Sequence, residues 1–135
     1  MRMTVSDRDD RLDVSFVFPD SRVFDLDSAL RQAGDKRWTF TPGSKGIDHL
    51  EFLLRDGQNR TFLASVRFTH GLEPPTRVLF DNKLPETGQY VRTHKLTVLG
   101  VVRDFLEECA NRGLVSRPQR DKAIAELNRH DKVEV

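Results

Sequence analysis

Three side chains that could together cleave RNA fall within one predicted β-hairpin. His49 and Glu51 stand two residues apart on the first strand, and Arg67 belongs to the second. Because alternate residues of a strand point to one face, we expect the three to share a face, with Arg67 diagonally across from the others. A carboxylate base would take the 2′-hydroxyl proton, an imidazole acid would protonate the leaving oxygen and a guanidinium would stabilise the phosphorane. Metal-independent RNA cleavage is therefore one hypothesis for this chain.

The same residues also fit a sheet face that does no chemistry. Antiparallel sheets commonly expose one face to water, and Glu51 and Arg67 would then form an ordinary surface pair. Leu53 and Leu63 fall on this face too, where they could floor a pocket or pack beneath a helix. The sequence leaves both alternatives open.

A basic cluster near the C-terminus is a second candidate site. Its members are Arg117, Arg120, Lys122 and Arg129. Basic side chains near a helix N-terminus can contact phosphates, so the cluster predicts nucleic-acid binding. The spacing of Lys122, Glu126 and Arg129 by four and three is equally typical of an exposed salt ladder. No aromatic residue interleaves the cluster, so base stacking is not indicated.

Metal and cofactor sites are not indicated by the sequence. The four histidines stand singly, without the HxH or HExxH spacing that metal sites use. Cys109, the lone cysteine, lies on the apolar side of a predicted helix, which favours a buried and inert thiol. No glycine-rich phosphate-binding loop is present. We therefore expect no metal and no cofactor.

The register of the hairpin decides which side chains share its faces. The two strands, Ile47–Arg55 and Arg60–Thr69, are joined by the sequence Asp-Gly-Gln-Asn. A two-residue turn at Asp56-Gly57 would put the leucines and phenylalanine of the first strand on the same face as Thr61, Leu63, Ser65 and Arg67. A loop of odd length instead pairs Leu50, Phe52 and Leu54 with Phe62, Ala64, Val66 and Phe68. We predict the odd loop, because burying one apolar face outweighs the local turn preference.

The remaining elements are predicted from periodicity and from stop signals. Strands are expected around residues 12–18, 38–40 and 77–81, a short helix capped by Asp25 and ended by Gly34, and the main core helix from Thr97 to about Arg112. Ser116 and Gln119 predict a capping box for a last helix, and residues 132–135 could add an edge strand. The first ten residues read as a flexible arm.

These elements predict an α+β fold in one domain, residues 1–135. We expect a mainly antiparallel sheet of four to five strands, with the long helix packed across it and a second helix at the C-terminus. The length suffices for one core, and nine phenylalanines supply it.

Charge and hydropathy narrow the possible partners. The 22 basic and 21 acidic residues give a net charge of +1, so any nucleic-acid partner must find a local patch. The sequence shows neither an apolar leader nor an apolar run of the ~20 residues that span a bilayer, which predicts a cytoplasmic location and no membrane partner.

The leading interpretation is a non-catalytic binding or regulatory module that contacts nucleic acid or a protein partner, with oligomers possible. One alternative is the RNA-cleaving enzyme. The other is a protein-only interaction or inhibitor domain that docks through an edge strand or through the acidic N-terminal arm.

Overall fold

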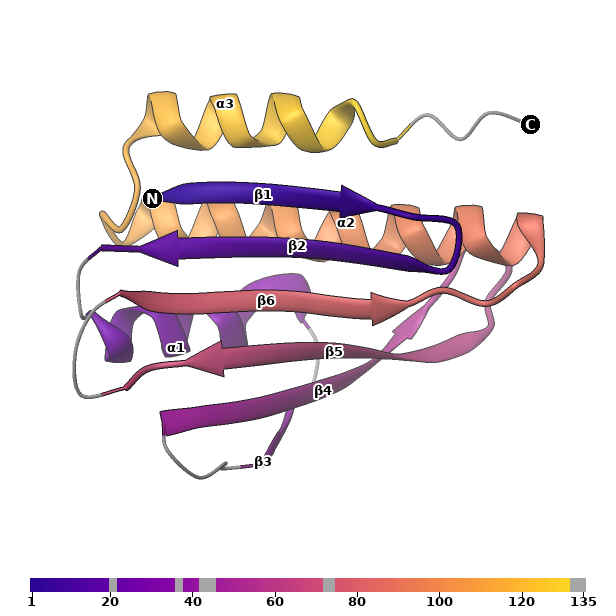
Figure 1. Cartoon of the computed structure of the whole chain (residues 1–135), viewed down its shortest axis with the longest axis horizontal. Coiled ribbons are helices and arrows are strands. Elements are labelled where there is room, and N and C mark those ends of the chain that lie inside the picture. Colours follow the sequence, from indigo (N-terminus) through magenta and orange to yellow (C-terminus); the bar gives the residue numbers. More distant parts are fainter. Residues whose placement is uncertain (20–21, 36–37, 42–45, 72–74, 132–135) are drawn as a thin grey trace.

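A six-stranded antiparallel sheet organises the chain (Figure 1). The computed structural model describes residues 1–19, 22–35, 38–41, 46–71 and 75–131. The strands are β1 (Arg2–Asp7), β2 (Arg11–Phe18), β3 (Trp38–Thr41), β4 (Ile47–Arg55), β5 (Thr61–Thr69) and β6 (Thr76–Lys83), in the spatial order β1-β2-β6-β5-β4-β3. The helices are α1 (Val23–Gln32), continued by the 3-10 turn η1 (Ala33–Asp35), then α2 (Gly88–Asn111) and α3 (Arg117–Asn128). The α+β fold is confirmed.

The sheet contains one strand more than the upper limit we predicted, and that strand is β1. Residues 1–10 were expected to be a flexible arm, but Arg2–Asp7 pairs antiparallel with β2 along its whole length. Only Met3 and Val5 of β1 pack against the apolar core, which is too short an alternation to stand out among charged neighbours. The flexible-arm prediction was therefore wrong.

The hairpin formed by β4 and β5 has the predicted register. Leu50 lies opposite Val66, and Phe52 lies opposite Ala64. The last pair is Arg55 with Thr61, so the loop between the strands has an odd number of residues, 56–60. Asn59 adopts φ 62°, a left-handed conformation that Asn tolerates better than most residues. Burial of one apolar face thus prevailed over the two-residue Asp-Gly turn.

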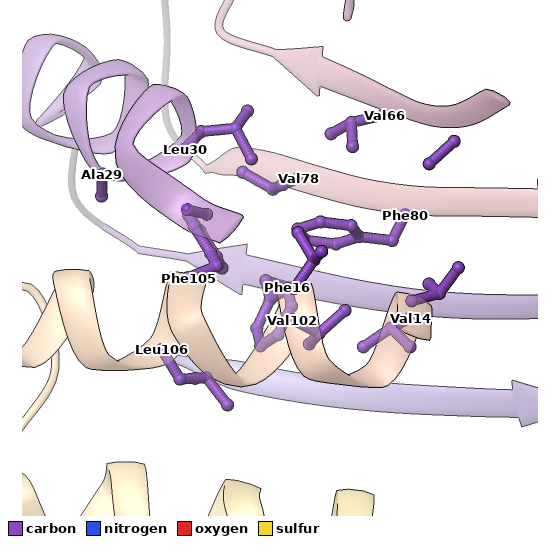
Figure 2. Close-up of a cluster of buried hydrophobic side chains, with 14 of the residues drawn as sticks. Val14, Phe16, Ala29, Leu30, Val66, Val78, Phe80, Val102, Phe105 and Leu106 are labelled. Carbon is purple, nitrogen blue, oxygen red and sulfur yellow. The ribbon is translucent and has the colours of Figure 1, made fainter. Parts of the chain in front are cut away.

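The core lies between one face of the sheet and the helices, and its centre is aromatic (Figure 2). Phe105 of α2 lies 5.3 Å from Phe16 of β2 and 5.6 Å from Phe80 of β6, measured between ring centroids. All three side chains are fully buried. The long helix therefore packs across the sheet as predicted, with α1 beside it on the same face (Figure 1).

Helix α2 begins nine residues before the predicted start at Thr97. Its additional turns carry His94 and Lys95, which are polar and yet buried. His94 contacts Asp56 in addition to stacking on the ring of Phe62, and Lys95 contacts Asp7. A search for periodic apolar residues cannot detect helical turns that ion pairs stabilise.

The remaining helix ends agree with the sequence except at the start of α1. Asp25 lies in the first turn of α1 and not at its cap, which is Arg22, and the two side chains form an ion pair of 2.7 Å. Gly34 and Gly113 both have φ 70°, as expected of residues that end helices. The capping box of Ser116 and Gln119 is present at the start of α3. The strand predicted for residues 132–135 lies outside the described residues.

Within the described part of the chain, no helix is both long and apolar enough to cross a membrane.

Candidate functional site

No described helix covers the face of the sheet turned away from α1 and α2 (Figure 1). We call the outward residues of four central strands the open face. They are Arg11, Asp13, Ser15 and Val17 of β2, Arg77, Leu79, Asp81 and Lys83 of β6, Thr61, Leu63, Ser65, Arg67 and Thr69 of β5, and Ile47, His49, Glu51, Leu53 and Arg55 of β4. They alternate with the buried core residues in each strand.

The structure brings the three predicted site residues together on the open face. Arg67 lies directly opposite His49, so the expected diagonal placement holds only relative to Glu51, which lies opposite Ser65. His49, Glu51 and Arg67 line one shallow hollow of about 60 Å³ together with Asp81. Nη2 of Arg67 lies 3.9 Å from Oδ2 of Asp81. A carboxylate from β6 therefore competes for the guanidinium that a phosphate would need.

Two carboxyl groups next to the hollow were missed by sequence reasoning. Asp13 of β2 lies directly opposite Asp81 of β6. Burial raises the pKa of Asp13. A hydrogen bond to Asp81 and the negative charge of Asp81 raise this pKa further, whereas the positive charge of Arg11 lowers it. Arg11 lies 3.3 Å from Asp81. The strand alternation predicts that both aspartates face outward, but they are 68 positions apart in the chain, and no local sequence pattern indicates that they pair.

The leucines of the open face form an exposed apolar pair. Leu53 and Leu63 lie directly opposite each other on β4 and β5. They are 60% and 61% exposed, so neither of the arrangements considered from the sequence holds within the described residues: no helix covers them, and the hollow is lined by other residues. Leu53 and Leu63 therefore form an apolar patch that is exposed to solvent on the open face.

The open face is more basic than the chain as a whole. Its basic residues are Arg11, Arg55, Arg67, Arg77 and Lys83, and its acidic residues are Asp13, Glu51 and Asp81. None of its residues is aromatic. The whole chain has a net charge of only +1, so the positive charge is concentrated on this side of the sheet.

The C-terminal basic cluster lies on α3 and on its C-cap residue, Arg129, and two of its four residues are neutralised by ion pairs. Arg120 contacts Glu107 at 3.2 Å and Asp121 at 2.9 Å, and Arg129 contacts Glu126 at 3.0 Å. The pKa of Arg120 is raised, and the hydrogen bond that Arg120 donates to Asp121 is the largest cause of this increase. Among the described residues, no acidic group lies within 4 Å of Arg117 or Lys122, and both are exposed. Nucleic-acid binding by this cluster stays a prediction.

A second cluster of titratable groups joins the β4–β5 loop to α2. Asp56 accepts hydrogen bonds from the backbone amides of Gln58 and Arg60 at 2.8 and 3.0 Å. His94 stacks on Phe62 with ring centroids 3.7 Å apart, and Arg60 lies 3.1 Å above the ring of Tyr90. Every member of this cluster has a partner within it, which is typical of a structural clasp.

Neither the single thiol nor the possible metal ligands of the described residues form a reactive site. Cys109 is buried, and burial raises the pKa of its thiol to about 12, so the nucleophilic thiolate is scarce at neutral pH. Within the described residues, no three His, Cys, Asp or Glu side chains are grouped so that they could hold a metal ion.

No protein-family model, curated protein or solved structure matches this chain.

Proposed function

We propose that this chain is a non-catalytic binding module that contacts a protein partner through the open face. The observation that carries the proposal is the exposed pair of Leu53 and Leu63, which lie directly opposite each other on adjacent central strands. Burying a leucine side chain fully is worth about 1.5–3 kcal/mol, so covering this pair would provide a substantial part of a binding free energy. An exposed apolar patch with a polar rim is characteristic of protein–protein contact sites.

The charged groups near the leucines support a partner of particular chemistry. Arg55 follows Leu53 along β4 and is exposed, and Arg67 lies four residues beyond Leu63 on β5. Arginine is enriched in protein interfaces, and complementary charge increases the rate and specificity of association. The partner's surface is therefore apolar at its centre and acidic at its rim.

Single-stranded nucleic acid fits the open face less well than a protein does. Binding of unpaired bases relies on aromatic side chains for stacking, and the open face has none. A nucleic acid would also leave the two leucines without an apolar partner. It would, however, use the same arginines, so the experiment must distinguish the two kinds of partner.

Site-specific photo-crosslinking in cells of the source organism makes that distinction. A photoreactive phenylalanine analogue replaces Leu63 in one variant and Phe24, which is 89% exposed on α1, in a control variant. The proposal predicts a protein adduct at position 63 that is absent at position 24. Adducts to RNA alone, or equal adducts at both positions, would contradict it.

A second candidate function, RNA cleavage, is favoured by one observation. His49, Glu51 and Arg67 line the same hollow, as general acid–base catalysis with phosphorane stabilisation requires. Purified protein should then cleave RNA in the presence of a chelator, and His49→Ala should abolish cleavage while Thr61→Ala, farther along the same face, retains it. Inactive wild-type protein, or active His49→Ala protein, would remove this candidate.

A further inference from the structure

A groove runs between the edge strand β1 and helix α3, away from the open face. It has a volume of about 430 Å³, within the range of small-ligand pockets. Met1 and Met3 line one wall, and Lys122, Ala123 and Glu126 line the other. Met1, Met3 and Ala123 thus supply apolar contacts in the groove, and Arg2, Lys122 and Glu126 supply charged groups.

One wall of the groove is the free edge of the sheet. Among the described strands, β1 pairs with β2 alone, so its other side presents backbone N–H and C=O groups without strand partners. Helix α3 lies along this edge and runs in the same direction as β1 (Figure 1). At the far end the walls meet, where Nδ1 of His130 lies 3.1 Å from Oδ2 of Asp7.

The other wall is held in place by contacts that do not cross the groove. Arg103 of α2 donates hydrogen bonds to Asn128 at 3.0 Å and to Asp131 at 2.5 Å, and Arg120 donates to Glu107 of α2 at 3.2 Å. These bonds fix α3 to α2 rather than to β1. The groove can therefore accept a ligand without separating the two helices.

We propose that this groove binds an extended acidic peptide, which adds a strand to β1. Strand addition takes affinity from main-chain hydrogen bonds and specificity from contacts of alternate side chains, and β1 with the walls of the groove offers both. The six residues of β1 span about 20 Å, so the paired segment has at most about six residues, and its contacts with the groove lie at the start of the strand, where Arg2 and Met3 line it.

The rim charges select the acidic peptide. Glu126 lies 3.0 Å from Arg129 and 3.6 Å from His130, so its charge is offset. Lys122 is exposed and, within the described part of the chain, has no acidic group within 4 Å. The ammonium group of Lys122 can therefore pair with an acidic side chain of the peptide.

A single strand fits this position better than a second copy of the chain. Pairing β1 with β1 of another molecule would bring a second α3 to an edge where the first already lies (Figure 1). The edge can accept only a narrow extended segment.

The test uses short peptides of known sequence, followed by amide NMR shifts of the full chain. The parent probe is a capped hexapeptide of alternating Asp and Val, and a Lys-Val peptide tests charge. Two further versions are N-methylated at the Asp or at the Val positions. Since only one set of amides of an added strand faces β1, one methylated version should bind about tenfold more weakly and the other should match the parent.

Surface variants complete the experiment. Lys122→Glu should weaken binding of the Asp-Val peptide several-fold and favour the Lys-Val peptide, whereas Lys83→Glu, on the open face, should change neither. Shifts of β1 and α3 amides with this pattern support the proposal. It is overturned if no peptide binds, if both methylated versions bind like the parent, if the shifts fall on the open face, or if sedimentation shows dimers joined through β1.

Discussion

Oδ2 of Asp56, at the start of the β4–β5 loop, lies 3.1 Å from Nε2 of His94 on α2. The two residues are 38 positions apart in the chain, and their contact fixes the loop to the first half of the helix. The side chain of Asp56 is fully buried and that of His94 is 10% exposed. This contact explains why α2 begins well before its apolar stripe.

Asp56→Asn should destabilise the protein at neutral pH and much less in acid. Burial alone would raise the pKa of Asp56, but the amides of Arg60 and Gln58 and the guanidinium of Arg60 outweigh it and lower the pKa to about 2. A lowered carboxyl pKa stabilises the fold above the unfolded value of 3.8, and this contribution disappears as the pH falls towards 2. Urea unfolding of both proteins from pH 7 to pH 2 should show the difference narrowing below pH 4. A constant difference would contradict the assignment.

His94 should contribute a separate loss of stability in mild acid. Burial lowers the pKa of His94, with Asp56 opposing the shift, so the unfolded chain binds a proton at higher pH than the folded protein does. Stability is then complete above about pH 6.5, the ordinary histidine value, and falls below it. His94→Gln should lower stability at pH 7.5, because the stacking on Phe62 is lost, and should flatten its dependence on pH between 7.5 and 5. An unchanged slope would show that another group is responsible.

Asp7 connects three elements, and its loss should release β1. Oδ2 of Asp7 lies 2.5 Å from Nζ of Lys95, a side chain that is only 8% exposed, and 3.1 Å from Nδ1 of His130. Asp7→Ala would leave a buried ammonium without its partner, at a cost of about 1–3 kcal/mol. Denaturation should measure that loss, and hydrogen exchange should show faster exchange in β1 than in β5. Asp7→Ala combined with Lys95→Met should regain most of the stability; if it does not, the ion pair is not the cause.

The structural features that could be predicted from the sequence are those that the burial of apolar side chains determines. The hairpin register followed from Leu50, Phe52 and Leu54, because a slip of one residue would expose the whole apolar face. The start of α2 depends on charged contacts between residues far apart in the sequence, such as Asp56 with His94 and Asp7 with Lys95. No local pattern encodes such pairs. The same reason explains why His49, Glu51 and Arg67 could be placed together on one face, whereas the pairing of Asp13 with Asp81 could not be predicted.

Phe105 should be among the most sensitive positions of the core. Its ring contacts Phe16, Phe18 and Phe80, with centroids 5.3–6.4 Å away, where α2 crosses the sheet (Figure 2). Phe105→Ala should cost about 3–5 kcal/mol, since it removes a buried ring and leaves a cavity. Phe24→Ala, at a position 89% exposed, should change stability by no more than about 0.5 kcal/mol. Equal losses in the two variants, measured by denaturation, would refute this description of the core.

The central claim is that Leu53 and Leu63 form the apolar centre of a protein-binding surface. The most direct measurement is the affinity of the purified crosslinked partner for wild-type protein and for Leu63→Thr, which keeps β-propensity while removing apolar area. The account predicts that Leu63→Thr, with an unchanged unfolding transition, binds at least about tenfold more weakly, or about 1.4 kcal/mol, while Phe24→Thr binds as the wild type does. Equal affinity of the Leu63→Thr and wild-type proteins would contradict it.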